Sequence, residues 1–217
     1  LQGEVTDERV VVKIADTMEN LEVEWQLYEK IIKVYPPIQG FLKYHGFFRC
    51  NDTLARAIDN GLGDNGLCEG SGDSMQVLVM EYINNLSMKR YDWSRHDTVT
   101  IQSCILQILC SLLEAYLAIG FVHGDMHLDN ILLRKNTTSN KHIPYNRLDI
   151  AIITGDLVVA IADLELCKEN ASPRAFFQDI RNLFQKASSD LLWCISDVKP
   201  FQECYNHARD WTENGEM

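Results

Sequence analysis

The chain contains the stretch Phe121-Val122-His123-Gly124-Asp125-Met126-His127-Leu128-Asp129-Asn130-Ile131-Leu132-Leu133, from which the rest of the sequence can be interpreted. Apolar residues at helical spacing precede this stretch and Ile-Leu-Leu ends it, which predicts a tight loop between a helix and a strand. Within the loop, Asp125 is a carboxylate that can orient an attacking hydroxyl and accept its proton. Asn130 carries an amide oxygen that can bind Mg²⁺. The residue types and their spacing therefore fit phosphoryl transfer.

The pattern His123-Gly124-Asp125-x-His127-x-x-Asn130 resembles the catalytic loop of the protein-kinase-like superfamily. The signature of that loop is His-Arg-Asp-Leu, three free positions and Asn. Gly124 occupies the Arg position, and His127 the position where protein kinases usually have Lys. The variant is similar to the aminoglycoside-phosphotransferase-type branch and to small atypical kinases of fungi and large DNA viruses. The resemblance implies that Asp125 is the catalytic base, Asn130 a metal ligand and His127 a neighbour of the γ-phosphate, while His123 supports the loop.

Composition limits the other classes of function. The chain has 217 residues, 46% of them hydrophobic, which fits one domain or two small lobes that share a cleft. The formal net charge of −11 argues against a nucleic-acid-binding face, because neutralising phosphates requires an excess of Lys and Arg. An acidic surface suits a basic substrate, but more often it is simply solvated.

The seven cysteines are an odd number and include no Cys-x-x-Cys pair, so neither a complete disulfide framework nor a zinc site is expected. Cys104 and Cys110 lie in an apolar helical pattern and are predicted to be small core residues. We therefore expect an intracellular, cytoplasmic protein in a reducing compartment. Four Asn-x-Ser/Thr sequons instead favour a secreted protein. No apolar run approaches the roughly 20 residues that span a bilayer, so no membrane partner is expected. The chain begins at Leu1, so a preceding targeting segment stays open.

The N-terminal segment contains a strand followed by a helix. Val10 to Ile14 is a β-branched run that includes Lys13, and residues 18–34 have helical periodicity. In kinases a strand lysine contacts the nucleotide phosphates and is paired with a helix glutamate. The candidate glutamates are Glu22, Glu24 and Glu29. By resemblance to the fungal and viral members, Glu24 is the predicted partner of Lys13.

Residues 76–83 form a predicted buried strand that ends at polar residues. Its sequence Val79-Met80-Glu81-Tyr82-Ile83 resembles the kinase strand and hinge between the two lobes. The resemblance implies that Met80 is the gatekeeper, and that the carbonyl group of Glu81 and the N–H group of Ile83 meet the adenine base. Periodicity alone predicts only a core strand.

A second apolar strand, Leu157 to Ala162, leads directly to Asp163. An aspartate at the end of a buried strand is costly unless it is paired or bound to a metal. Asp163-Leu164-Glu165 resembles the Asp-x-Glu of the phosphotransferase branch, which implies that Asp163 is the second Mg²⁺ ligand. Asp179 is predicted near the start of a later helix, where it either anchors the catalytic loop or interacts with the helix dipole.

Two features depart from ordinary protein kinases. No Gly-x-Gly-x-x-Gly motif precedes Lys13, and only 15 residues separate Asp163 from Asp179. The 15 residues between Asp163 and Asp179 are too few for a long activation loop. Gly124 also replaces the arginine that would bind a phosphorylated activation loop. Regulation by activation-loop phosphorylation is therefore not expected.

The sequence thus predicts an α+β, bilobal, protein-kinase-like fold. We expect an N-terminal lobe at residues 1–83 with a small antiparallel sheet and one helix. A minimal, mostly helical C-terminal lobe would follow at residues 84–217. The expected function is Mg²⁺-ATP-dependent transfer of a phosphoryl group to a hydroxyl of a small molecule or of an atypical Ser/Thr protein substrate. A pseudokinase that serves as a nucleotide-binding or protein-interaction scaffold is the alternative, and the oligomeric state is left open.

Overall fold

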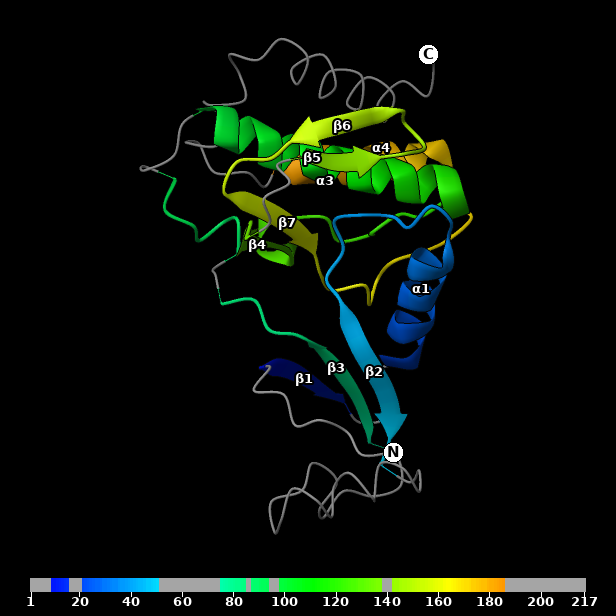
Figure 1. The fold of residues 1–217 in the computed structure, drawn as a ribbon. Coiled ribbons are helices and arrows are strands. Elements are labelled where there is room, and N and C mark those ends of the chain that lie inside the picture. Colours follow the sequence, from blue (N-terminus) through cyan, green and yellow to red (C-terminus); the bar gives the residue numbers. More distant parts are fainter. Residues whose placement is uncertain are drawn as a thin grey trace. The chain divides into compact units, whose positions relative to one another are not determined.

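The computed structural model describes residues 9–15, 21–50, 75–84, 87–93, 98–137 and 142–185. Its contacts divide the chain into two units: Leu1–Tyr28 with Lys43–Tyr82, and Glu29–Leu42 with Ile83–Met217. The last of the three division points, between residues 82 and 83, lies one residue before the predicted lobe boundary between residues 83 and 84. Residues 29–42, which were assigned to the N-terminal lobe, group with the second unit instead. The elements are labelled in Figure 1, and their mixture of helices and small antiparallel sheets is the expected α+β class.

The first unit is built on a three-stranded antiparallel sheet. Its strands are β1 (Val10–Ala15), β2 (Tyr44–Arg49) and β3 (Gln76–Glu81), in the order β1-β3-β2. The central strand β3 pairs with a neighbour on each side, and its Val77 and Leu78 side chains are fully buried. The predicted strands at 10–14 and 76–83 are therefore both present, and β3 pairs with both other strands.

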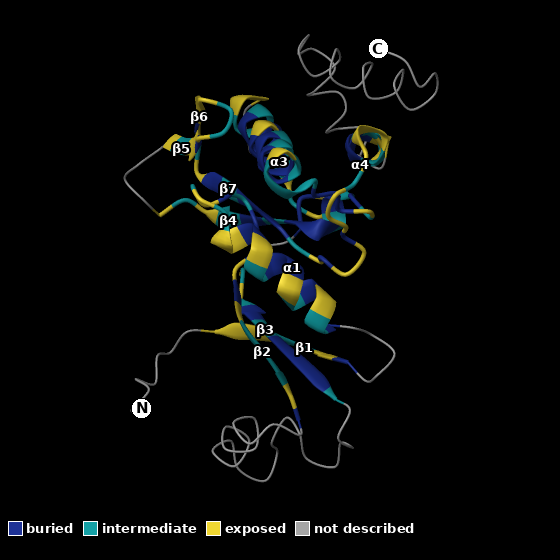
Figure 2. Ribbon diagram, turned by 90° about the vertical axis from the view of Figure 1, so that its right-hand side faces the viewer, coloured by how far each residue is buried: buried dark blue, intermediate teal, exposed yellow. Residues whose placement is uncertain are grey.

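Helix α1 (Leu21–Lys33) follows β1. Its buried residues recur at helical spacing, at Leu21, Glu24, Leu27, Tyr28 and Ile31. Buried and exposed residues consequently alternate along the helix in Figure 2. In the first unit Tyr28 stacks on Tyr44 of β2, with ring centroids 4.5 Å apart. The helix ends just before Pro36-Pro37, as expected for residues that lack an N–H group and restrict their neighbours.

The second unit is organised around helix α3 (Thr98–Ile119), which ends at Gly120 as predicted. Gly120 has a φ of +65°, the left-handed conformation that glycine adopts at helix ends. Cys104 and Cys110 are buried in this helix, as predicted, and burial raises the pKa of their thiols to about 12 and about 11. In the first unit Cys50 is disulfide-bonded, and its partner cysteine lies outside the described residues.

By length and composition alone, α3 could cross a membrane, because an 18-residue window of it has a mean hydropathy of 1.5. The prediction that no apolar run approaches the length that spans a bilayer is therefore wrong for this helix. In the structure 61% of that window is buried inside the protein. Core helices of soluble proteins meet the same criterion, so the pattern is weak evidence for a membrane span.

Two antiparallel strand pairs complete the β structure of this unit. Strand β4 (Ile131–Lys135) pairs with β7 (Leu157–Ile161), and β5 (His142–Tyr145) pairs with β6 (Ile150–Ile153). The sequence between Asn130 and Asp163 is longer than in ordinary protein kinases, which predicts an extended hairpin, and the paired strands confirm it. Strand β5 was not predicted, because Pro144 lies in its middle. A small hydrophobic cluster that includes Cys110 of α3 and Tyr145 of β5 packs this second hairpin against the central helix.

Helix α4 (Pro173–Gln185) begins six residues before the predicted start at Asp179. Ser172 and Pro173 account for the earlier start, because serine caps helices and proline fits their first turn. The Ser172 hydroxyl accepts a hydrogen bond from the N–H group of Ala175 at 3.4 Å. The sequence also predicts an exposed, acidic, glycine-rich loop at residues 59–74 and at most two helices within residues 190–217, and both segments lie outside the described residues.

Candidate active site

The loop at residues 121–130 is anchored by a buried carboxylate. Asp179 of α4 is only 3% exposed and accepts hydrogen bonds from the backbone N–H groups of His123 and Gly124, the latter at 3.1 Å. Burial raises the pKa of Asp179, and the donated N–H bonds oppose that rise. Of the two roles considered for Asp179, the structure therefore supports anchoring of the loop.

Gly124 has a backbone conformation that explains why arginine is absent from this position. Its φ is +81°, and a Cβ atom added there would lie 2.4 Å from the carbonyl oxygen of Leu166. A side chain would therefore be strained both by the left-handed backbone and by the close approach of a second segment. That second segment, which follows Asp163, also pairs with Val122 through two backbone hydrogen bonds to Lys168 of 2.9 and 2.8 Å.

His123 is fully buried and connects the loop to the strand that carries Asp163. Its Nε2 atom lies 3.0 Å from the carbonyl oxygen of Ala162, which can only accept, so Nε2 carries the hydrogen. The N–H group of Ala162 donates to the carbonyl oxygen of Asn130 at 2.9 Å. One residue, Ala162, thus connects His123, Asn130 and Asp163.

Asp125 and His127 lie side by side within the loop. Nε2 of His127 is 3.2 Å from Oδ2 of Asp125, whose side chain is 39% exposed. A carboxylate oxygen only accepts hydrogen bonds, so this contact requires a proton on Nε2 of His127. His127 therefore orients the Asp125 carboxylate in this structure. The expected place of His127 beside a γ-phosphate stays a prediction.

In the first unit, Lys13 and Glu24 form the predicted ion pair. Nζ of Lys13 lies 3.1 Å from Oε2 of Glu24, a side chain that is 1% exposed. The second carboxylate oxygen of Glu24 accepts the hydroxyl of Tyr44 at 2.5 Å. The other two candidate glutamates have different partners, since Glu22 pairs with Arg49 and Glu29 pairs with Lys33. The role of the Lys13–Glu24 pair in binding a nucleotide stays a prediction.

Comparison with known proteins shows what part of this chain is similar to. Residues 72–154 match the model of the ABC1 atypical kinase-like domain, a segment that contains the loop with Asp125 and Asn130. A protein of Dictyostelium discoideum named as a probable serine/threonine-protein kinase is 30% identical over 114 residues, which are 48% of this chain and 9% of that protein. An uncharacterized protein of Caenorhabditis elegans is 27% identical over 144 residues, 64% of this chain and 44% of that protein.

The matched segment is thus similar to kinase-like domains of the protein-kinase-like superfamily. The chain spans less than half of the length of either relative, at 9% and 44%. The matched segment ends before Asp163 and begins after Glu24. For Lys13, Glu24 and Asp163, the described contacts therefore carry the argument.

The two predicted metal ligands flank the same end of the β4–β7 pair, because Asn130 directly precedes β4 and Asp163 follows β7 by two residues. Ile131 is paired with Ile161, so the next residues on each strand, Asn130 and Ala162, face each other directly before Asp163. Nδ2 of Asn130 donates to the carbonyl oxygen of Asp125 at 3.1 Å, which leaves its Oδ1 atom for a cation. Asp163 has a φ of +64° and is exposed. One amide and one carboxylate oxygen suit Mg²⁺, which is commonly held by one or two carboxylates together with substrate phosphates.

Within the described ranges, no group of three or more His, Cys, Asp or Glu side chains forms a metal site. This observation excludes a closed, all-protein cage among those residues. It is compatible with an ion held by Asn130, Asp163 and the phosphates of a nucleotide, because amide and phosphate oxygens are not members of such a group.

The hinge residues occupy the end of β3 and the residues after it. Met80 is buried, and Glu81 forms two hydrogen bonds with the backbone of Lys43: its Oε1 atom accepts at 2.7 Å and its N–H group donates at 2.9 Å. Ile83 begins the segment Ile83–Met217, which the contacts assign to the second unit. Their predicted contacts with adenine are not tested by this geometry.

Sequence reasoning missed Asp129, which fixes the loop from its exposed side. Its carboxylate accepts from Nζ of Lys89 at 2.6 Å and from Oγ of Ser87 at 3.3 Å. The hydrogen bond from Lys89 is the largest cause of the lowered pKa of Asp129. Asp129 lies between Leu128 and Asn130, which are both buried, and this position was the only local sign of its role. Its partner Lys89 is 40 residues away, so the sequence could not indicate the pair.

Proposed function

We propose that this chain is the catalytic region of a Mg²⁺-ATP-dependent phosphotransferase that acts on a hydroxyl group. The observation that supports this proposal most strongly is the position of Ala162, hydrogen-bonded to both Asn130 and His123 and directly followed by Asp163. It brings the two expected metal ligands next to the loop that carries Asp125. The relatives support kinase chemistry at the level of the superfamily.

In the proposed reaction, the Asp125 carboxylate accepts a hydrogen bond from the acceptor hydroxyl and takes its proton as the phosphoryl group is transferred. The oxygen–phosphorus bond forms at the acceptor, the bond between the γ-phosphorus and the bridging oxygen breaks, and ADP leaves. His127 keeps the Asp125 carboxylate oriented through its Nε2–H group. Lys13, which Glu24 orients within its own unit, is the residue proposed to contact the nucleotide phosphates. Mg²⁺, held by Asn130 and Asp163, would neutralise the phosphate charge.

The first candidate for the acceptor is a serine or threonine hydroxyl of a protein. Its support is the similarity to the Dictyostelium protein, which is named as a probable serine/threonine-protein kinase. A small-molecule hydroxyl is the second candidate, because Gly124 and His127 depart from the protein-kinase signature. Both share the same chemistry at Asp125, so the first test does not depend on which of them is correct.

The test measures Mg²⁺-dependent transfer of radiolabelled γ-phosphate to the protein itself, to mixed protein substrates and to hydroxyl-bearing small molecules. Asp125→Asn should reduce the rate by about 10²–10⁴, the usual contribution of a positioned base. Asp149→Asn, an exposed carboxylate in the β5–β6 turn, should leave the rate unchanged. Equal rates in the wild type and Asp125→Asn would contradict the assigned base. A folded protein that binds ATP without any transfer would indicate the pseudokinase alternative.

A further inference from the structure

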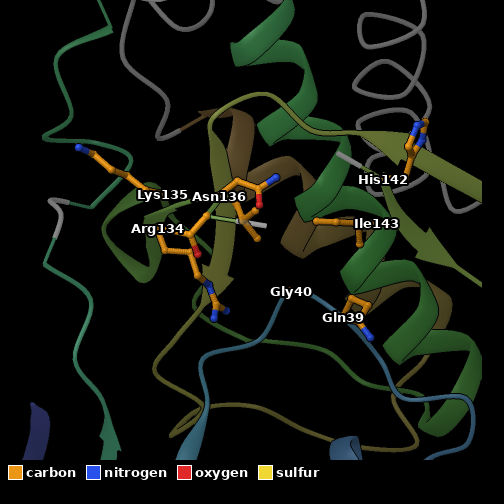
Figure 3. Close-up of a pocket in the computed structure, with 9 residues that line it drawn as sticks. Gln39, Gly40, Arg134, Lys135, Asn136, His142 and Ile143 are labelled. Carbon is orange, nitrogen blue, oxygen red and sulfur yellow. The ribbon is translucent and has the colours of Figure 1, made fainter. Parts of the chain in front are cut away.

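A cavity of about 450 Å³ lies within the second unit, at the Lys135 end of β4. Its walls come from the ends of β4 and β5, from Val158 of β7, and from Gln39 and Gly40 in the segment before Phe41. Figure 3 shows the arrangement of these side chains. The volume falls within the range of roughly 300–1,000 Å³ that is typical of small-molecule sites.

The charge of this cavity is opposite to that of the chain as a whole. Arg134 and Lys135 are cationic, His142 is a third residue of a basic type, and none of the described residues that line the cavity is acidic. The whole chain carries a net charge of −11, so a basic cavity is not expected from composition. The local field therefore favours an anionic ligand.

The side chains divide the cavity into a polar and an apolar part. In Figure 3, Arg134 and Asn136 lie on one side of the space, and Gln39 and Ile143 lie on the other, whereas Lys135 extends away from it. Arg134 is therefore the principal cation of the wall. Its position is fixed in part by a hydrogen bond from Nη2 to the carbonyl oxygen of Phe41 at 3.5 Å. Ile143 and Val158 supply apolar surface.

We propose that this cavity binds a small organic anion. Its carboxylate or phosphate group would meet Arg134, whose planar guanidinium group matches the oxygen geometry of both anions. The amide of Gln39, which donates to the Pro37 carbonyl oxygen at 3.5 Å, has a second N–H hydrogen for the ligand, and an apolar part of the ligand packs against Ile143 and Val158.

This site is separate from the proposed catalytic residues. Arg134 lies four residues from Asn130 along β4, which is about 13 Å at the usual rise of a strand. Val158 lies on the partner strand β7, which leads to Asp163 at the same far end. A ligand in the cavity therefore contacts the two strands that carry the expected metal ligands without occupying their site.

The test uses three probes that share one ring: phenyl phosphate, benzoate and the neutral benzyl alcohol. Each is titrated into the ¹⁵N-labelled chain while backbone amide resonances are followed. Phenyl phosphate or benzoate should shift the amides of Gly40, Ile143 and Val158 at millimolar concentration, and benzyl alcohol should bind at least about tenfold more weakly. The two anionic probes distinguish a phosphate ligand from a carboxylate ligand.

Arg134→Gln should weaken binding of the anionic probes by about tenfold or more, as expected for loss of a charged hydrogen bond. Lys168→Gln, an exposed lysine outside the cavity, is the matched control and should bind as the wild type does. Should Arg134→Gln fail to fold, the exposed His142→Gln should still weaken binding measurably. The proposal is wrong if no amide around the cavity shifts, if benzyl alcohol binds equally well, or if both variants bind like the wild type.

Discussion

Glu24 is a buried carboxylate with two partners, and this determines what its replacement should do. Glu24→Gln removes the charge that holds Lys13 while keeping an oxygen for Tyr44. We expect a loss of about 1.5–3 kcal/mol in the free energy of unfolding or in ATP binding, the usual value of a charged hydrogen bond. Urea denaturation and ATP titration measure the two quantities.

The control for this change is Glu22→Gln, because Glu22 pairs with Arg49 on the exposed side of the same helix. An exposed pair contributes only about 0.2–1 kcal/mol. Equal losses in the two variants would show that the buried pair has no special role.

Asp129 gives a prediction about pH. Its pKa is lowered in the folded state, chiefly by the hydrogen bond from Lys89, so its carboxylate stabilises the fold above the unfolded pKa of about 3.9. That contribution is lost as the pH falls through the lower, folded pKa. The difference in the free energy of unfolding between wild type and Asp129→Asn should therefore be constant above about pH 5 and shrink below about pH 4.

Urea denaturation at pH 7, 5 and 3.5 checks this expectation. The difference at pH 7 should be about 0.2–1 kcal/mol, since the pair is largely exposed. Asp149→Asn should show no such shrinkage. A difference that grows toward low pH would mean that the sign of the effect has been assigned wrongly.

At the scale of elements, the loop at residues 121–130 is joined to α4 through Asp179. Asp179→Ala leaves the N–H groups of His123 and Gly124 without their acceptor, at a cost of roughly 1–3 kcal/mol each. Asp179→Asn keeps an oxygen for them and removes a buried charge, so it should be less destabilising than alanine. Thermal and urea unfolding measure both variants, and alanine as the milder change would contradict the anchoring role.

Gly124 joins the loop to the segment after Asp163. Gly124→Ala places a Cβ atom 2.4 Å from the Leu166 carbonyl oxygen, and its left-handed backbone alone costs about 1–2 kcal/mol. We expect a clear loss of stability and of phosphoryl transfer. Gly46→Ala is the control, because a Cβ atom there would have no neighbour within 4 Å. Comparable losses in the two variants would contradict this account.

Several elements could be predicted from local sequence, and others could not. The apolar periodicity of α3 and the β-branched runs of β1, β3 and β7 are long enough to fix the type of element. The predicted start of α4 at Asp179 was wrong, because the helix begins at Pro173, after the capping residue Ser172. Strand β5 was missed because a proline interrupts its pattern, and its position depends on packing of Tyr145 against α3.

For the whole molecule, many contacts between distant residues could be predicted only from the resemblance to kinases and not from local residue patterns. The ion pair between Lys13 and Glu24 and the placement of Asn130 and Asp163 at the same end of the β4–β7 pair both join residues distant in sequence, which only a known fold could suggest. Three features were not predicted: the contacts of Asp129, the contact of Tyr44 with Glu24, and the basic cavity. Each joins residues from different elements, and no sequence motif links those elements. The grouping of residues 29–42 with the second unit also depends on contacts, such as that of Leu42 with Ile161.

The most direct test of the central claim is a thermal unfolding measurement with ATP and Mg²⁺ on the wild type, Asp163→Asn and Asp149→Asn. Both aspartates have positive φ angles, +64° and +54°, and asparagine tolerates that conformation. ATP at about 100 times its dissociation constant stabilises by roughly 2.7 kcal/mol, a rise of about 5–10 °C for a chain of this size. The account predicts this rise, dependent on Mg²⁺, in the wild type and Asp149→Asn but not in Asp163→Asn. No rise in the wild type at millimolar ATP, or an equal rise in all three proteins, would contradict it.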